Sequence, residues 1–216
     1  MLTPASNRSL RPRLIRHAVF ALASLLAWGL GESVHGQAPA ASTSTEEQRR
    51  EAHYKAAYLA HLLRYSTWDE ADLPSKDETV GLAVIGADRH QFAQALLFLI
   101  NELDVTLQGR AIKVFSLARI PDADEEEEIF KGCAVVFFLE SENERWSECT
   151  LCEKKGVLAV GEGAKYAQEG ACVSFVRSRN RIRLLVNREG YSSRNLKISS
   201  KLFKLRSAVE VFQKEG

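Results

Sequence analysis

The chain has 216 residues, of which 29 are Lys or Arg and 28 are Asp or Glu, giving a formal net charge of +1. A composition of 45% apolar and 26% charged residues is typical of a globular domain; it excludes a wholly disordered chain, a coiled coil and a strongly basic nucleic-acid binder. The charge is unevenly distributed. Residues 1–36 hold four Arg and one Glu and carry +3, whereas the rest, with 25 basic and 27 acidic residues, carries −2.

The basic beginning is followed by residues 18–30 (AVFALASLLAWGL), which carry no charge. This order of basic, apolar and small residues is typical of a secretory signal peptide. As a helix, the apolar run would span only about 20 Å, less than the ~30 Å core of a bilayer. We therefore expect residues 1–36 to be a Sec-type signal peptide, cleaved after Gly36 or after Ala40, with an uncleaved membrane anchor as the alternative. A flexible leader, 37–45, should precede a single exported domain over residues 46–216.

Apolar residues at helical spacing predict helices over residues 46–65 and 89–103, the second with Asp88 at its N-cap. Short apolar runs predict strands at residues 80–85, 111–115, 133–139 and 157–160. Between them, we expect a short helix from the acidic run 122–128, a longer helix over 141–154 and a helical turn at 161–169.

The last part of the chain predicts a β-hairpin, with strands at 172–176 and 182–187 around a polar RSRNR turn, and then a helix over 196–212. Alternating strands and helices favour a parallel sheet. The fold class expected is therefore α/β, with a largely parallel central sheet, helices on both faces and a C-terminal β-hairpin plus helix.

Motifs for nucleotide binding and common catalytic chemistry are missing from the sequence. The turn at residues 86–89 (GADR) matches neither the dinucleotide nor the P-loop pattern, and no Ser stands in a G-x-S-x-G elbow. His53 and His61 lie two helical turns apart and are expected to be exposed, as are the acids of 122–128. The sequence therefore predicts no catalytic residue, no metal site and no cofactor.

Four cysteines are candidates for disulfides: Cys133, Cys149, Cys152 and Cys172. Cys133 begins a predicted strand, the expected helix after it would return Cys149 and Cys152 to the same sheet edge, and Cys172 begins a later strand. An even number of cysteines in an exported protein favours disulfides, here with the pairing open among three connectivities. A redox-active Cys149-x-x-Cys152 pair and a four-cysteine zinc site are the alternatives.

Aromatic and basic residues give weaker signals for a binding surface. The first predicted helix and its exit carry four aromatic residues, Tyr54, Tyr58, Tyr65 and Trp68, which either core packing or a partner-binding groove would explain. Arg177, Arg179, Arg181 and Arg183 alternate along the predicted hairpin, so we expect them to share one face, as a solvated tip or an acidic-partner patch. The candidate partner-binding residues are Tyr58, Tyr65, Trp68, Arg181 and Arg183.

Three stretches together resemble the YfiR-like family. They are residues 54–68 (YKAAYLAHLLRYSTW), residues 133–139 (CAVVFFL) after an LQGR passage at 107–110, and residues 182–205, which contain Asn187 and NLKISSKL at 195–202. The resemblance covers residues 54–212. The chain departs from the family pattern at Asp69, where Pro is common, and at Arg194-Asn195, where a Gly often precedes Leu. We expect Asn187 and residues 196–202 to determine the fold rather than to contact a partner.

The resemblance implies a small α/β periplasmic protein that is not an enzyme and needs no cofactor. Such a protein binds and inhibits the periplasmic region of a membrane-bound diguanylate cyclase and so controls cyclic-di-GMP. The implied partners are that cyclase, an outer-membrane lipoprotein that sequesters the repressor, and a second copy in a homodimer, but no nucleic acid. The alternatives are a periplasmic small-ligand sensor for another signalling partner and a thiol oxidoreductase using Cys149 and Cys152.

Overall fold

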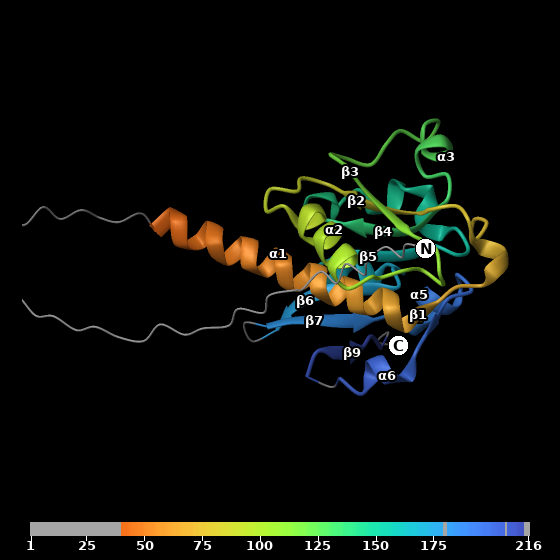
Figure 1. Ribbon diagram of the computed structural model, residues 1–216. Coiled ribbons are helices and arrows are strands. Elements are labelled where there is room, and N and C mark those ends of the chain that lie inside the picture. Colours follow the sequence, from red (N-terminus) through yellow and green to blue (C-terminus); the bar gives the residue numbers. More distant parts are fainter. Residues whose placement is uncertain (1–39, 179–180, 206, 214–216) are drawn as a thin grey trace, which may run out of the picture. The chain divides into compact units, whose positions relative to one another are not determined.

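A largely parallel sheet of seven strands forms the centre of the described part of the chain, in the order β3-β2-β4-β5-β6-β7-β9 (Figure 1). The computed structural model describes residues 40–178, 181–205 and 207–213, with side chains from Thr45 onward. Every neighbouring pair is parallel except β6 and β7, which form an antiparallel hairpin. The strands are β2 (Val80–Ile85), β3 (Ile112–Leu117), β4 (Cys133–Phe138), β5 (Leu158–Glu162), β6 (Val173–Ser178), β7 (Arg181–Val186) and β9 (Val209–Val211).

Two longer helices and several short helical turns surround the sheet. The longer helices are α1 (Ala40–Tyr65) and α2 (Phe92–Glu102), which pack against each other. The short α-helices are α3 (Glu126–Ile129), α4 (Ala164–Gln168), α5 (Arg188–Ser192) and α6 (Ser200–Phe203). Four 3₁₀ turns are η1 (Glu70–Asp72), η2 (Glu140–Glu142), η3 (Trp146–Glu148) and η4 (Thr150–Glu153), and a separate two-stranded sheet pairs β1 (Ser66–Thr67) with β8 (Lys197–Ile198).

Two neighbouring phenylalanines of β4 show that both faces of the sheet are covered. Phe137 stacks on Phe92 of α2, with ring centroids 4.2 Å apart, whereas Phe138 packs on Tyr166 of α4 and on Trp146. Because successive side chains of a strand point to opposite faces, α2 and α4 must lie on opposite sides. The predicted α/β fold, with a parallel sheet between helices and a C-terminal hairpin, is confirmed.

The helix predicted over residues 141–154 is wrong. This stretch forms η2, η3 and η4 instead. In an α-helix the Thr150 amide would donate to the carbonyl of Trp146, but here it donates to the Glu126 carboxylate, at 3.0 Å. A long-range contact to a buried acid therefore replaces the helical hydrogen bond.

The long closing helix predicted over residues 196–212 is also wrong. Only α6 is helical, and it is followed by the strand β9, whose Val209 and Val211 pair with Leu184 and Val186 of β7. Residues 209–211 form a strand because they make backbone hydrogen bonds with the edge of β7. The local sequence pattern gives no sign of this distant partner. The C-terminal region thus adds a strand to the predicted hairpin.

The expectation that the hairpin arginines share one face is wrong. β6 and β7 pair Arg177 with Ile182 and Ser178 with Arg181, so Arg177 lies on the face of Ile182, opposite to Arg181 and Arg183. The expectation assumed that strand alternation continues through the turn. Arg179 lies outside the described residues.

Candidate partner-binding groove

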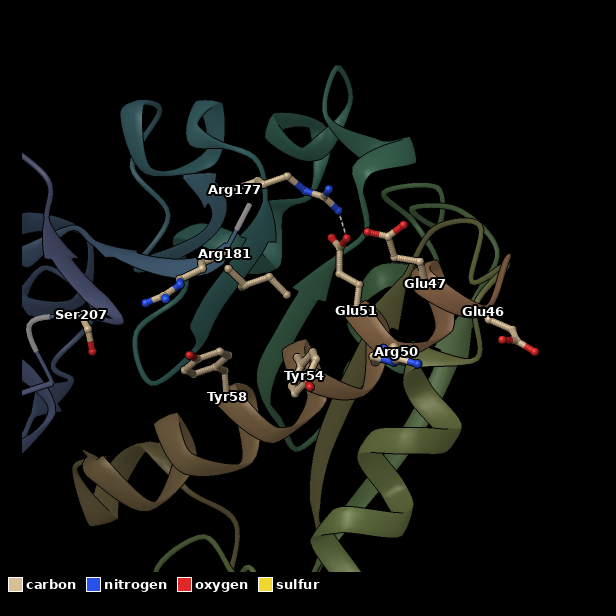
Figure 2. A pocket seen from close by; sticks show the side chains of 10 residues that line it. Glu46, Glu47, Arg50, Glu51, Tyr54, Tyr58, Arg177, Arg181 and Ser207 are labelled. Atoms are coloured by element: carbon tan, nitrogen blue, oxygen red, sulfur yellow. Dashed lines mark ion pairs between the residues drawn. The ribbon is translucent and has the colours of Figure 1, made fainter. Parts of the chain in front are cut away.

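A groove of about 590 Å³ lies between the first half of α1 and the β6–β7 hairpin (Figure 2). The α1 wall consists of Glu46, Glu47, Arg50, Glu51, Tyr54 and Tyr58, and the other wall consists of Arg177, Arg181, Ile182 and Ser207. The residues on α1 follow a spacing of three or four, which places them along one side of the helix. Segments at least 119 residues apart in the sequence, from Tyr58 to Arg177, thus form one concave surface.

Ion pairs connect the hairpin to α1 at one end of this groove. Arg177 pairs with Glu51 (Figure 2), and Lys55 lies between Glu51 and Glu162, at 2.8 and 3.2 Å. Lys55, Glu51 and Glu162 are mostly buried, with 18%, 20% and 13% of their side chains exposed. Partly buried charges are screened less by salt than surface charges. These pairs therefore help to hold the groove open and in shape.

Tyrosines form the apolar part of the groove. Tyr54 is 58% exposed although it is large and aromatic, and Tyr58 is half-buried. Tyr58 also lines an adjoining apolar groove of about 280 Å³, together with His61, Tyr65, Leu184, Leu202, Leu205, Ala208 and Val209. The two grooves thus meet at Tyr58 and follow one side of α1.

The structure brings three of the five candidate partner-binding residues to this region. Tyr58 and Arg181 line the first groove, and Tyr65 lines the adjoining one. Trp68 is only 3% exposed, and its backbone amide donates to Gln108, so its side chain is not available at the surface. Arg183 shares its strand face with Arg181, but it pairs with Glu210 at 2.9 Å and is not among the residues that line either groove.

Sequence reasoning missed six of the residues that line the groove: Glu46, Glu47, Arg50, Glu51, Ile182 and Ser207. The signal for Glu47 was its spacing of four from Glu51 on the same helix, a pattern that places two side chains on one side. Ile182 belongs to a strand whose face could be assigned only once the register of the hairpin was known.

All four cysteines are free thiols and buried in this structure. Burial raises the pKa of Cys133 and of Cys172 to about 11, and a hydrogen bond with Cys149, together with burial, raises the pKa of Cys152. Protonated, inaccessible thiols are weak nucleophiles, which argues against the oxidoreductase alternative. Disulfide formation stays a prediction.

The cysteines gather at the amino end of the sheet, as expected. Cys133 begins β4, and Cys172 directly precedes the parallel strand β6. The Arg194 guanidinium donates to the carbonyls of Cys152 and Gly190, and the Gly190 carbonyl also accepts from the Cys172 thiol. Within the described residues, no group of three or more His, Cys, Asp or Glu side chains could hold a metal ion.

The acidic run 122–128 is exposed except at one position. Glu126 is 4% exposed and accepts hydrogen bonds from the amide and the hydroxyl of Thr150. The prediction of a fully solvated acidic face was therefore wrong for Glu126, because its register in α3 directs it inward.

Residues of the stretches that resemble the YfiR-like family make buried polar contacts. The guanidinium of Arg110 is 3% exposed, donates to the carbonyl of Pro74 and pairs with Glu70, whose pKa it holds below the usual value. The Asn187 side chain accepts from the Gly190 amide and donates to the Ala167 carbonyl, at 3.0 and 2.8 Å. Both residues thus connect separate segments, and the contacts of Asn187 support the fold-determining role expected for it.

Among the described residues, none of the helices is long and apolar enough to cross a membrane. The predicted signal peptide and cleavage sites lie outside the residues that the structure describes.

Comparisons with known proteins place the chain in a family. Residues 52–206 match the family described as YfiR/HmsC-like. No curated protein matches the chain. Among solved structures, a conserved domain protein from Vibrio cholerae is 10% identical, with a TM-score of 0.43; the match covers 75% of this chain and 60% of that one. Since the family match spans well over half of the sequence, the chain belongs to the YfiR/HmsC-like family, whose members are periplasmic regulators of signalling.

Proposed function

We propose that this protein is an exported regulator that binds and inhibits the periplasmic region of a membrane-bound signalling enzyme, a diguanylate cyclase, and so lowers cyclic-di-GMP. The observation that carries the proposal is the family match over residues 52–206. The basic and apolar beginning of the chain supports export to the periplasm. As a regulator, the protein would act by contact and have no catalytic activity of its own. An outer-membrane lipoprotein and a second copy of the chain are further partners in this proposal.

Inhibition by contact requires a difference in affinity between two states of the cyclase. A regulator that binds active and inactive cyclase equally well shifts nothing, however tight the complex. Moving the cyclase from 99% active to 99% inactive would take about a 10⁴-fold preference for the inactive state. The groove beside α1 offers tyrosine and arginine side chains, which dominate binding energy in many interfaces.

Deletion of the gene tests this function in the cell. Cyclic-di-GMP should rise in the deletion strain when the neighbouring membrane cyclase is present, and it should not rise in a strain that also lacks the cyclase. An unchanged level in the single deletion would reject the proposed function.

A second groove favours the small-ligand sensor as an alternative function. About 440 Å³ of space lies at the carboxyl ends of β2, β4 and β5, lined by Arg89, His90, Ser141 and Glu162 among others. In the sheet, β3 lies on one side of β2 and β4 lies on the other, so the strand order reverses direction at β2. Open parallel sheets bind ligands at such a switch point. The ring atom Nδ1 of His90 is buried there without a hydrogen-bond partner among the described residues. A ligand-dependent rise in melting temperature would support this alternative.

A further inference from the structure

We infer that the groove between α1 and the β6–β7 hairpin receives an amphipathic helix of the partner, running antiparallel to α1, with acidic residues in its first turn and basic residues in its last. This inference rests on the proposed function, because it assigns the contact surface of that interaction. It follows from the pairing of β7, from the apolar floor of the groove and from the positions of the groove charges outside the Arg177–Glu51 pair.

The strands next to the groove favour a helix over an added strand. β7, which contributes Arg181 and Ile182, already pairs with β6 on one side and β9 on the other. On the outer side, β9 covers only Leu184–Val186, so an extended peptide finds just residues 181–183 of β7 as a backbone edge, which is shorter than a typical strand of about five or six residues. A helix needs none, because its own backbone hydrogen bonds are satisfied and it binds a groove through one apolar face.

The floor of the groove suits the apolar face of such a helix. Tyr54, Tyr58 and Ile182 line it, and Tyr54 keeps 58% of its surface exposed. An exposed tyrosine that is covered on binding is a typical binding hot spot, since its ring is large and loses little conformational freedom. From Glu47 to Tyr58 the α1 wall rises about 16 Å, which matches roughly three turns of a partner helix.

The charges give the partner helix its direction. Glu47 lies near the start of α1, beside Glu51, whereas Arg181 lies near Tyr58 and extends toward Ser207 (Figure 2). Glu51 and Arg177 are already paired with each other. The other groove charges at the start of α1 are Glu46, Glu47 and Arg50, which sum to −1, whereas Arg181 supplies a positive charge at the other end. Acids are favourable in the first turn of a helix and bases in the last. If the partner helix has its N-terminus at Arg181 and its C-terminus at Glu47, acids in its first turn can pair with Arg181 and bases in its last turn with Glu47. Both positions are also the ones that the helix dipole favours.

The groove is also preformed. The Arg177–Glu51 pair and the two contacts of Lys55 hold α1, the hairpin and β5 together without a partner. A preformed site loses less entropy on binding than one that must be ordered first. The partner helix therefore meets a surface that needs little rearrangement.

Binding of the full-length membrane cyclase in nanodiscs to variants of this protein tests the inference. We expect Tyr54→Ala to weaken binding at least about tenfold, as a hot-spot residue does. Arg181→Glu and Glu47→Lys should each weaken it several-fold. Phe98→Ala, at an α2 position that is 57% exposed, and Lys113→Glu, on the edge strand β3, are the matched controls and should bind like wild type. Melting temperatures close to wild type would show that each variant is folded.

The outcomes separate this inference from the proposed function. If wild type binds the cyclase and Tyr54→Ala, Arg181→Glu and Glu47→Lys all bind equally well, the groove is not the contact surface, although the proposed function stands. A loss with Tyr54→Ala alone would overturn the assigned charges and direction of the helix. Absence of binding by wild type would overturn the proposed function and, with it, the occupant assigned here.

Discussion

At the scale of single residues, buried cations connect segments of the fold. Arg194 is 7% exposed and donates to the carbonyls of Cys152, Gly170 and Gly190. These three carbonyls belong to the turns before β5, before β6 and within α5. One guanidinium thus donates to backbone acceptors of three segments, of which the Gly190 carbonyl also accepts from the Ser193 hydroxyl. A buried acceptor left without a hydrogen bond costs about 1–3 kcal/mol.

Replacement of Arg194 should therefore destabilise the protein far more than replacement of an exposed arginine. We expect Arg194→Met to lower the free energy of unfolding by about 2–4 kcal/mol, because the hydrogen bonds from this guanidinium to the three carbonyls are lost. Arg64→Met, at an exposed position of α1, should change it by less than about 0.5 kcal/mol. Urea unfolding measures both values, and equal stability of the two variants would contradict the role assigned to Arg194.

The residue next to it explains a departure from the family pattern. Asn195 has a φ of 60°, in the left-handed region that favours Gly and tolerates Asn. The YfiR-like pattern often has Gly before the Leu of the closing stretch, so the sequence changes here while the backbone conformation that the position needs is kept.

At the scale of elements, the packing of α1 depends on small residues. Ala52, Ala56 and Ala60 recur every four residues and are almost completely buried, on a helix that contacts α2 along much of its length. A spacing of four places them in one row on the helix surface. Small side chains in that row let the elements that cover it approach α1 closely.

Enlarging this row should weaken the contact between α1 and its neighbours. We expect Ala56→Leu to lower the free energy of unfolding by about 1–3 kcal/mol through overpacking, whereas Ala57→Leu, at a half-buried position, should cost less. Chemical denaturation compares the two variants. Equal stability of Ala56→Leu and wild type would show that the row is not tightly packed.

The central strands and first two helices could be predicted because their signals are local. The run 133–139 is β4 almost residue for residue, and the spacing of residues 89–103 is that of α2. The N-cap of α2 is Gln91 and not Asp88 as predicted, although the Asp88 carboxylate accepts from the amides of Phe92 and Ala93. The segments that failed depend on distant partners. Residues 141–154 are held by Glu126, and Val209 and Val211 become a strand only because β7 has a free edge.

The candidate groove could be predicted only in part for the same reason. Tyr58 and Arg181 were candidates because of their residue type and position in a helix or hairpin. The packing of α1 against a hairpin far away in the sequence decides which candidate residues line the groove. It brings Tyr58 and Arg181 together there, whereas Trp68 is buried and Arg183 pairs with Glu210.

At the scale of the whole molecule, the near-neutral charge combines a +3 beginning with a −2 remainder. If the beginning is removed on export, the cysteines reach an oxidising compartment, where we propose that they form disulfides. Alkylation of the exported protein without reduction, followed by mass spectrometry, should then leave at least one pair of cysteines unmodified. Four alkylated cysteines in the unfolded protein would contradict the disulfides.

The central claim is that this protein inhibits a membrane-bound diguanylate cyclase by contact in the periplasm. The most direct measurement is the rate at which the full-length cyclase, in nanodiscs, converts GTP to cyclic-di-GMP as the exported protein is added. We predict that the rate falls to a low plateau, and that Tyr54→Ala shifts the midpoint to higher concentration while Phe98→Ala does not. A rate that stays constant at all concentrations of wild-type protein, although the two proteins bind, would contradict the claim.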